Sequence, residues 1–329
     1  MQSPSHTGQN GSMADSRVVA RPDLTKARAG RRLGKSVRKY YQIYIILFVC
    51  AAIVFVFDYI PMYGVTMAFR EYRFNLGLFR SPWVGFQYFR AFFNYHNFAL
   101  IIRNTLVIGL FKVFLYFPLP ILFAVMLNEL RAVGFKRVIQ TVTYLPYFVS
   151  WVVAIQLLQH FLALDGIINE IRVGMGLSRV FFMNSPDFFY PIMFFSFVWK
   201  QIGMSSIIYL AALAGVDPQL YESAEVEGAG RIRKIWHISI PGIMPTIVVL
   251  FILNIANLLR VGWEQIFLLR TPGNMHLADI IDTYVIQQGL QGGQFGYATA
   301  VALFQSVIGL ALVIATNALA KRVSELSLF

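Results

Sequence analysis

The chain has 329 residues, of which 57% are hydrophobic and 13% are charged, and its formal net charge is +12. Soluble domains contain about 25% charged residues, and the apolar residues here form long blocks that a soluble core does not require. The composition therefore predicts an integral membrane protein of the helical type. It also argues against nucleic-acid binding, because much of the positive charge lies just outside an apolar run, where it sets membrane topology.

The single cysteine, Cys50, lies inside an apolar run and excludes both an intrachain disulfide and a metal cluster built on thiols. Residues 1–40 are Ser/Gly-rich and then basic, with no apolar run, so they are not a cleavable signal peptide. We expect a cytoplasmic, partly disordered tail there, with a short surface helix from about Arg31 to Tyr41.

Six apolar stretches have the roughly 20 residues that a membrane-spanning helix needs. They are residues 41–60, 103–127, 138–162, 189–213, 241–262 and 297–319. Pro118 and Pro120 predict a kink in the second stretch, and Pro241 suits the first position of the fifth helix. The sequence thus predicts an all-α membrane protein with six transmembrane helices.

We divide the chain into the tail, a first helix with its outer loop, a membrane core and a short C-terminal tail. The last three are residues 41–102, 103–322 and 323–329. Lys and Arg are concentrated in the tails and in the loops after the second and fourth stretches, which indicates that both termini and the 214–240 loop are cytoplasmic. The aromatic-rich loops at 61–102, 163–188 and 263–296 are then expected outside, at the membrane interface or against an extracytoplasmic partner.

The loop between the fourth and fifth stretches has two oppositely charged halves. Asp217 and Pro218 favour a helix start, because Asp caps free N–H groups and Pro fits the first turn. We expect an acidic helix over 218–227, a break near Gly228 and Gly230, and a basic helix from 231 to about 238. From charge alone, a solvated loop held by local ion pairs explains this pattern equally well.

The spacing within this loop resembles the coupling loop of type I ABC importer permeases. Glu222-Ser223-Ala224, then Gly228, then Ile238-x-Ile240-Pro241 is similar to that family's E-A-A–x3–G–x9–I-x-L-P pattern. Ser223, Glu227 and Ile240 replace the usual Ala, Asp and Leu, which are small changes. The resemblance implies a coupling helix that inserts into a cleft of an ATPase subunit, and the residues it assigns to coupling are Glu222, Ser223, Ala224, Gly228, Arg231 and Pro241.

Other segments extend the resemblance from about residue 41 to residue 322. Asn104-Thr105-Leu106 is similar to the start of the family's core domain. Further segments look like the subgroup that imports oligosaccharides and polysaccharide fragments, including alginate and complex glycans; they are 117–120, 127–129, 144–146, 207–213 and 282–284. The family implies a maltose-permease-like core in the bacterial inner membrane.

The resemblance also implies a set of partners. The chain would be the transport subunit of an ATP-driven importer and not itself an enzyme, with no cofactor of its own. The expected partners are a second homologous permease, two ATPase subunits that hold ATP and Mg, an extracytoplasmic solute-binding protein, membrane lipid and an oligosaccharide, but no nucleic acid. Acidic, alginate-like chains are among the candidate cargoes, and the alternative is another small polar solute on the same fold.

Several short patterns do not carry the chemistry that they suggest. The run from Ala29 to Gly34-Lys35-Ser36 fits a relaxed phosphate loop but lacks the preceding strand that such a site needs, so the ATPase must be a separate chain. The histidines His96, His160, His237 and His276 lack metal-ligand spacing. A secondary transporter would need membrane-embedded carboxylates, which are almost absent from the predicted spans. A membrane enzyme would need a catalytic cluster at the bilayer edge, and the sequence shows none.

Two lysines lie inside predicted spans, Lys112 in the second and Lys200 in the fourth. A charge in the bilayer core costs about 3 kcal/mol on insertion scales, so such residues usually face protein or water. Singly, each is expected to snorkel or to pair with a carbonyl or a distant acid such as Asp58 or Glu264. Together they suit a positive path for an acidic sugar, and other candidates for that path, which also serve as interhelical contacts, are Trp151, Gln156, Gln159, Tyr209, Asn254, Asn257 and Gln305.

Overall fold

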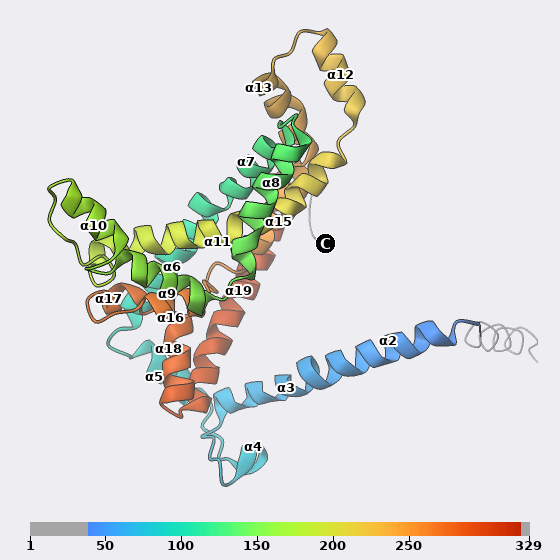
Figure 1. Ribbon diagram of the computed structural model, residues 1–329. Coiled ribbons are helices and arrows are strands. Elements are labelled where there is room, and N and C mark those ends of the chain that lie inside the picture. The colour runs from blue at the N-terminus through green and yellow to red at the C-terminus, as the bar shows by residue number, and fades with distance from the viewer. Residues whose placement is uncertain (1–38, 324–329) are drawn as a thin grey trace, which may run out of the picture. The chain divides into compact units, whose positions relative to one another are not determined.

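A computed structural model describes residues 39–323 (Figure 1). The regular elements in this part of the chain are helices, and an isolated bridge between Arg70 and Trp83 is the one β contact among them. Helices satisfy their own backbone N–H and C=O groups, as a bilayer requires, and the predicted all-α fold is confirmed. The chain divides into two compact units, Met1–Tyr63 and Gly64–Phe329.

The described part of the first unit is one continuous helix. Its parts are α2 (Tyr41–Val54), a π-helical turn η1 (Phe55–Tyr59) and α3 (Ile60–Met62). Large apolar side chains on every side of this helix are exposed within the chain, which suits a helix surrounded by lipid or by a partner subunit. The surface helix expected from Arg31 lies almost wholly outside the described residues.

The second unit begins with short elements and then alternates long helices with breaks. The short elements are η2 (Tyr63–Phe69), α4 (Gly77–Arg80) and α5 (Gln87–Phe93). The long ones are α6 (Phe98–Leu110) with η3 (Phe111–Tyr116) and α7 (Pro118–Asn128), α8 (Val133–Tyr144), α9 (Trp151–Leu162), α10 (Ile167–Gly174), α11 (Pro186–Ala214), α15 (Met244–Ala256) and α19 (Phe295–Val323). In the bundle, α11 packs on α7 and α8, whereas α19 packs on α15, α18 (Ile281–Ile286) and α5.

Five helical stretches of the described chain are long and apolar enough to span a membrane. They are Tyr41–Phe69, Phe98–Asn128, Trp151–Gly174, Pro186–Ala214 and Phe295–Lys321. A sixth is a bent pair, Arg231–Gly242 and Met244–Ala256, with an angle of 63°. Counting that pair as one span gives the six that the sequence predicts.

The third predicted span, 138–162, is wrong as a single helix. α8 ends at Tyr144, a 3-10 turn η4 (Leu145–Phe148) follows, and Val149 and Ser150 are extended before α9 begins. Pro146 has no N–H to continue the α-helical ladder. Ser150 then caps the new helix, since its side chain accepts a hydrogen bond from the Val153 N–H at 3.3 Å.

The fifth predicted span, 241–262, is wrong at both ends. Helix already runs through α13 (Arg231–Lys234), η5 (Ile235–Ser239) and α14 (Ile240–Gly242), and it bends before α15. Pro245 cannot donate to the Pro241 carbonyl, and its ring crowds that carbonyl, which accounts for the bend. At the far end α15 stops at Ala256, and the chain stays non-helical until Gly262, whose φ is +85°.

A glycine allows two membrane helices to approach closely. A Cβ atom at Gly203 of α11 would lie 2.2 Å from the Thr143 carbonyl oxygen of α8. No side chain fits there without a backbone shift. The contact is of the small-residue type that is common where membrane helices pack.

We expect Gly203→Ala to destabilise the purified protein by about 1–3 kcal/mol, because the added methyl group forces the two helices apart. Gly134→Ala is the matched control, since Gly134 is exposed in the first turn of α8 and a Cβ there meets nothing within 4 Å. The control should leave the melting temperature unchanged or raise it slightly. Equal melting temperatures for Gly203→Ala and the unmodified protein would contradict the close approach.

Candidate coupling loop and translocation path

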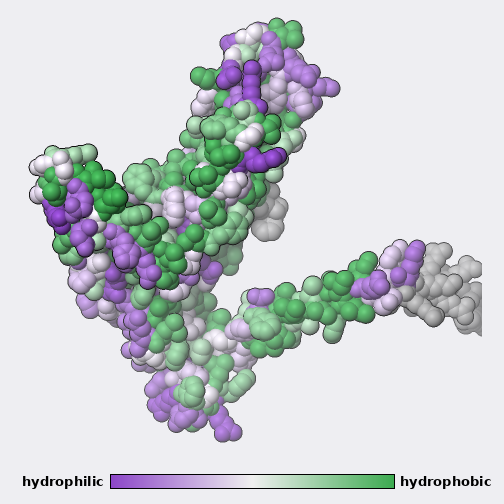
Figure 2. Space-filling view, viewed as in Figure 1, coloured by the Kyte–Doolittle hydropathy of each residue, from purple (hydrophilic) through white to green (hydrophobic). Residues whose placement is uncertain are grey.

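The polar loop forms a helical hairpin that projects from the bundle (Figure 1). Its first arm, α12 (Pro218–Val226), begins as the sequence predicts: the Asp217 side chain accepts a hydrogen bond from the Gln219 N–H at 2.9 Å. Its second arm begins at Arg231 and continues through η5 and α14. Figure 2 shows hydrophilic residues gathered on this projection.

Gly228 ends the first arm in a conformation that other residues rarely adopt. Its φ is +76°. The Ala229 N–H donates to the Ala224 carbonyl at 2.8 Å, and the Gly228 N–H donates to the Glu225 carbonyl at 3.0 Å. This pair of bonds is the Schellman arrangement, which satisfies the last carbonyls of a helix and places glycine at the left-handed position. The predicted break at Gly228 is therefore a defined turn.

The acids of the first arm differ in their surroundings. Glu225 accepts a hydrogen bond from Lys234 of the second arm at 2.8 Å, and this bond and the positive charge lower the pKa of the Glu225 carboxyl. The pair is thus complete above the ordinary glutamate pKa and is lost on acidification. Glu222 is exposed and, among the described residues, has no ion-pair partner. Its carboxylate is available to a basic group outside this chain.

The other residues assigned to coupling lie on the same hairpin. Ser223 and Ala224 line a groove of about 480 Å³ together with Glu227, Arg233 and His237. Arg231 begins the second arm, where it borders a hollow that also includes Glu129 and Arg131. Pro241 is exposed near the bend, at the far end of the arm. Five of the six assigned residues thus lie on the projecting part of the hairpin, and Pro241 lies at its base.

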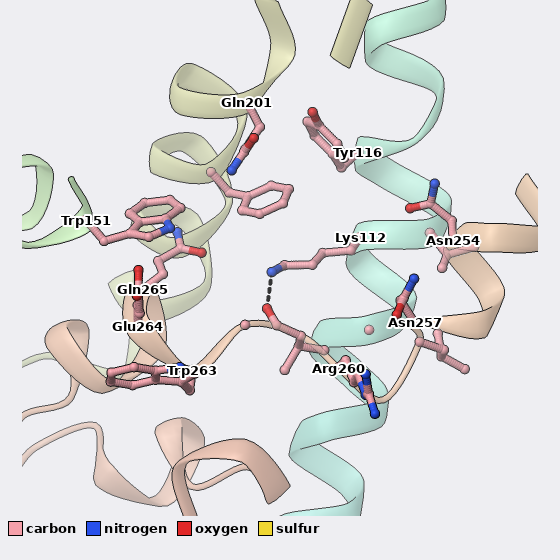
Figure 3. A pocket seen from close by; sticks show the side chains of 16 residues that line it. Lys112, Tyr116, Trp151, Gln201, Asn254, Asn257, Arg260, Trp263, Glu264 and Gln265 are labelled. Carbon is pink, nitrogen blue, oxygen red and sulfur yellow. Dashed lines mark hydrogen bonds between the residues drawn. The ribbon is translucent and has the colours of Figure 1, made fainter. Parts of the chain in front are cut away.

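A second site lies inside the bundle, where a cavity of about 390 Å³ borders the non-helical segment 257–262 (Figure 3). Its walls come from α6 with η3, α9, α11, α15 and α16 (Trp263–Leu269). Its polar and aromatic lining is Lys112, Tyr116, Trp151, Phe197, Gln201, Asn254, Asn257, Arg260, Trp263, Glu264 and Gln265. Non-helical backbone at membrane depth is tolerated only where it is buried in protein or lines a water-filled cavity. This cavity is therefore the candidate path.

Hydrogen bonds from neighbouring helices satisfy the non-helical segment. Gln305 of α19 donates to the Leu259 carbonyl at 2.6 Å and to Asp282 at 2.8 Å. Asp282 also accepts the Gly262 N–H at 3.2 Å. The segment is thus held open by contacts from α18 and α19, and Gln305 belongs to this support and not to the cavity lining.

Lys112, on η3 at another wall of the cavity, also bonds to the non-helical segment. Within η3 the Phe117 N–H bonds to the Lys112 carbonyl at 3.0 Å in a π-helical pattern. A π turn thus lies just before Pro118, where the sequence predicts a kink, and Phe98–Asn128 remains one span. The Lys112 ammonium donates to the Val261 carbonyl and lies 4.0 Å from the centre of the Phe197 ring. An ammonium has three donors, and no described acid forms an ion pair with it.

Comparison with known proteins shows the family. Residues 116–325 match the model described as the binding-protein-dependent transport system inner membrane component. The chain belongs to this family. It is therefore a multi-pass inner-membrane permease, and the predicted type I ABC importer permease fold is confirmed.

Two Bacillus subtilis relatives match most of this permease. The polygalacturonan/rhamnogalacturonan transport system permease protein YteP is 42% identical over 301 residues, 91% of this chain and 94% of the relative. Protein LplB is 42% identical over 275 residues, 83% of this chain and 86% of the relative.

Solved structures agree with these relatives. A chain of a bacterial ABC transporter involved in import of the acidic polysaccharide alginate is 38% identical, with a TM-score of 0.80 over 89% of this chain and 99% of that chain. A chain of a bacterial alginate ABC transporter in complex with alginate pentasaccharide-bound periplasmic protein is 37% identical, with a TM-score of 0.81 over 90% and 100% of the two chains.

The permease places the residues suggested for the path in different surroundings. Lys112, Trp151, Asn254 and Asn257 line the cavity. The remaining candidates lie elsewhere: Gln156 and Gln159 are exposed on α9, whereas Tyr209 and Lys200 are buried in protein. A role in transport stays a prediction for all of them.

Lys200 is buried against the break before α9 and uses two of its three N–H donors there. It is 5% exposed and donates to the Tyr147 carbonyl at 2.7 Å and to the Val149 carbonyl at 2.6 Å. These carbonyls lie where the chain is not α-helical. The contact matches the expectation that each lysine, taken singly, pairs with a carbonyl.

Sequence reasoning missed the contribution of the segment after α15, which it divided between a span and an outer loop. Arg260, Trp263, Glu264 and Gln265 line the cavity. The available signal was Gly262 inside an apolar run, because glycine is a poor helix former. The side chain of Gln265 is 2% exposed, and no described residue donates to its Oε1 atom. Burying an acceptor without a hydrogen bond costs about 1–3 kcal/mol of folding free energy.

We expect Gly228→Val to loosen the last turn of α12, because a β-branched residue at positive φ costs about 1–2 kcal/mol. Hydrogen exchange of the α12 amides should then be about five- to thirtyfold faster. Gly228→Asn is the control, since asparagine tolerates this conformation and should retain most of the protection. Identical exchange in all three proteins would show that the turn does not require its observed conformation.

Proposed function

We propose that this permease is the transport subunit of an ATP-driven importer that carries acidic oligosaccharides or polysaccharide fragments. The observation that carries the proposal is the cavity, which holds a lysine with donors to spare beside a non-helical segment. The relatives support the cargo class: one is named for polygalacturonan and rhamnogalacturonan transport, and a structural neighbour imports the acidic polysaccharide alginate. A neutral sugar or another small polar solute is the alternative.

The proposal includes the partners that such a subunit requires. A second, similar permease would complete the pathway, two ATPase subunits with ATP and Mg would dock on the coupling hairpins, and a solute-binding protein would deliver the cargo from outside. Both termini and the hairpin then face the cytoplasm, which the distribution of Lys and Arg supports. The chain itself performs no covalent chemistry.

The coupling step follows from the hairpin. Glu222 is exposed and free to meet a basic group in an ATPase cleft, whereas Glu225 is occupied by Lys234. ATP binding would close the ATPase pair and move both hairpins. Because the second arm continues into α15 through the bend at Ile243, this movement would reach the cavity wall and switch the side to which the cavity opens.

The first test purifies the complete importer through a tag on this chain and reconstitutes it in liposomes with binding protein and an oligogalacturonate trimer. We expect ATP-dependent uptake that Glu222→Ala lowers more than tenfold, since an interfacial charge pair loses its carboxylate. Glu225→Gln is the matched control and should lower uptake only slightly, because it breaks only an exposed pair within the hairpin. Uptake that is insensitive to ATP and to Glu222→Ala would refute the function.

The second test asks whether the path is built for anions. Lys112→Ala should raise the KM for oligogalacturonate about tenfold, because a charge-assisted hydrogen bond is lost. The KM for a neutral galactose trimer should change less than twofold. If Lys112→Ala changes neither KM, or changes both equally, the cavity does not select acidic cargo. Lys200→Ala serves as the comparison, because Lys200 is occupied by two carbonyls and should show no preference between the sugars.

A further inference from the structure

The amide of Gln265 is held in one orientation at the cavity wall. Its Nε2 donates to the Met193 carbonyl at 2.7 Å and to the Ser196 Oγ at 2.8 Å. The Ser196 hydroxyl itself donates to the Ile192 carbonyl at 2.6 Å, so its oxygen acts as the acceptor for Gln265. A flipped amide would place its oxygen against the Met193 carbonyl, which has no proton to offer. The orientation is therefore fixed.

The fixed orientation directs an unused acceptor to the interior of the bundle. In Figure 3 the Gln265 oxygen points toward the space that Lys112 also enters. Among the described residues nothing donates to this atom, although buried polar atoms nearly always have a partner. The oxygen is fully buried among side chains, so a donor that enters the cavity would reach it after a neighbouring side chain moves aside.

We propose that Gln265 is a specificity-determining residue that accepts a hydrogen bond from a ring hydroxyl of the transported sugar. The proposal rests on the function proposed above and names a contact in the same cavity. Gln265 Oε1 can only accept, whereas the Lys112 ammonium can only donate. An acceptor and a nearby cation with free donors are together complementary to a hydroxyl group beside a carboxylate. A uronic acid unit carries both groups on one ring.

The two residues therefore read different parts of the cargo. Lys112 binds the carboxylate, so removing its ammonium raises the KM for acidic sugars alone. Gln265 accepts a hydrogen bond from a hydroxyl, which acidic and neutral sugars share, so removing its amide raises the KM for both. This difference separates a ligand contact at Gln265 from a general effect of charge in the cavity.

The test uses the complete importer in liposomes, with initial uptake rates for oligogalacturonate and for a neutral galactose trimer. We expect Gln265→Met to raise the KM for both sugars about five- to tenfold, the effect of one lost hydrogen bond, with a maximal rate within twofold of the unmodified importer. A KM that is unchanged for both sugars would overturn the proposal, because the missing donor would then be a water molecule or Lys112 itself.

Two control variants separate this contact from packing. Ser196→Ala removes one anchor of the amide but leaves its oxygen in place, so the KM should stay within about twofold. Gln42→Met makes the same chemical change at an exposed position of α2 and should have no effect. If Ser196→Ala raises the KM as much as Gln265→Met does, Gln265 acts through helix packing and the proposal is wrong.

A cargo series gives the same answer without a variant of Gln265. In oligogalacturonate trimers with one ring hydroxyl at a time replaced by fluorine, the donor is lost with little change in size. The unmodified importer should show a raised KM for one of them, and equal KM values throughout the series would overturn the proposal. An importer that moves neither sugar would instead refute the function proposed above, so the two failures are distinct.

Discussion

The need to satisfy every backbone polar group within the membrane governs this structure. Most of the chain meets it with helices, and the segment from Asn257 to Gly262 meets it with backbone turns and with side chains. Gln305, Asp282 and Lys112 come from three different elements and converge on that one segment. The non-helical segment is stable because these groups donate to it or accept from it. The cavity lies beside this segment because no helix fills the space there.

This constraint also explains the two lysines. Each ammonium lies where helix is interrupted and donates to carbonyls that lack a helical N–H. Lys200 uses two such carbonyls and is closed off from the cavity, whereas Lys112 uses one and faces it. Two residues that look alike in the sequence thus differ through the number of carbonyls that their surroundings offer.

Local chemistry made part of the structure predictable. The start of α12 at Asp217 and Pro218 and its end at Gly228 depend on neighbouring residues alone, and the spacing around Glu222 was specific enough to indicate the family. The helix breaks were harder to place. Pro146 and Pro245 lie in long apolar runs, where hydropathy favours an unbroken span and the loss of one N–H decides otherwise.

The cavity lining was the least predictable part, since it depends on which helix faces which. Gln156 and Asn254 have similar chemistry, but one is exposed on α9 and the other lines the cavity. Gln265 lies in a segment assigned to an outer loop, and only the turn at Gly262 brings it to the wall. Side-chain direction across packed helices is a tertiary property that the pattern of one chain does not encode.

The continuity of the second hairpin arm has a mechanical consequence. From Arg231 to Gly242 the helix is unbroken, and its tip is braced by the turn at Gly228 and by the bond between Lys234 and Glu225. Such an arm is stiff along its length, so little of a load applied at its tip is absorbed before Ile243. Bending is then expected at Ile243, where the two helices meet at 63°, so a rotation of the arm would pass to α15 through that residue.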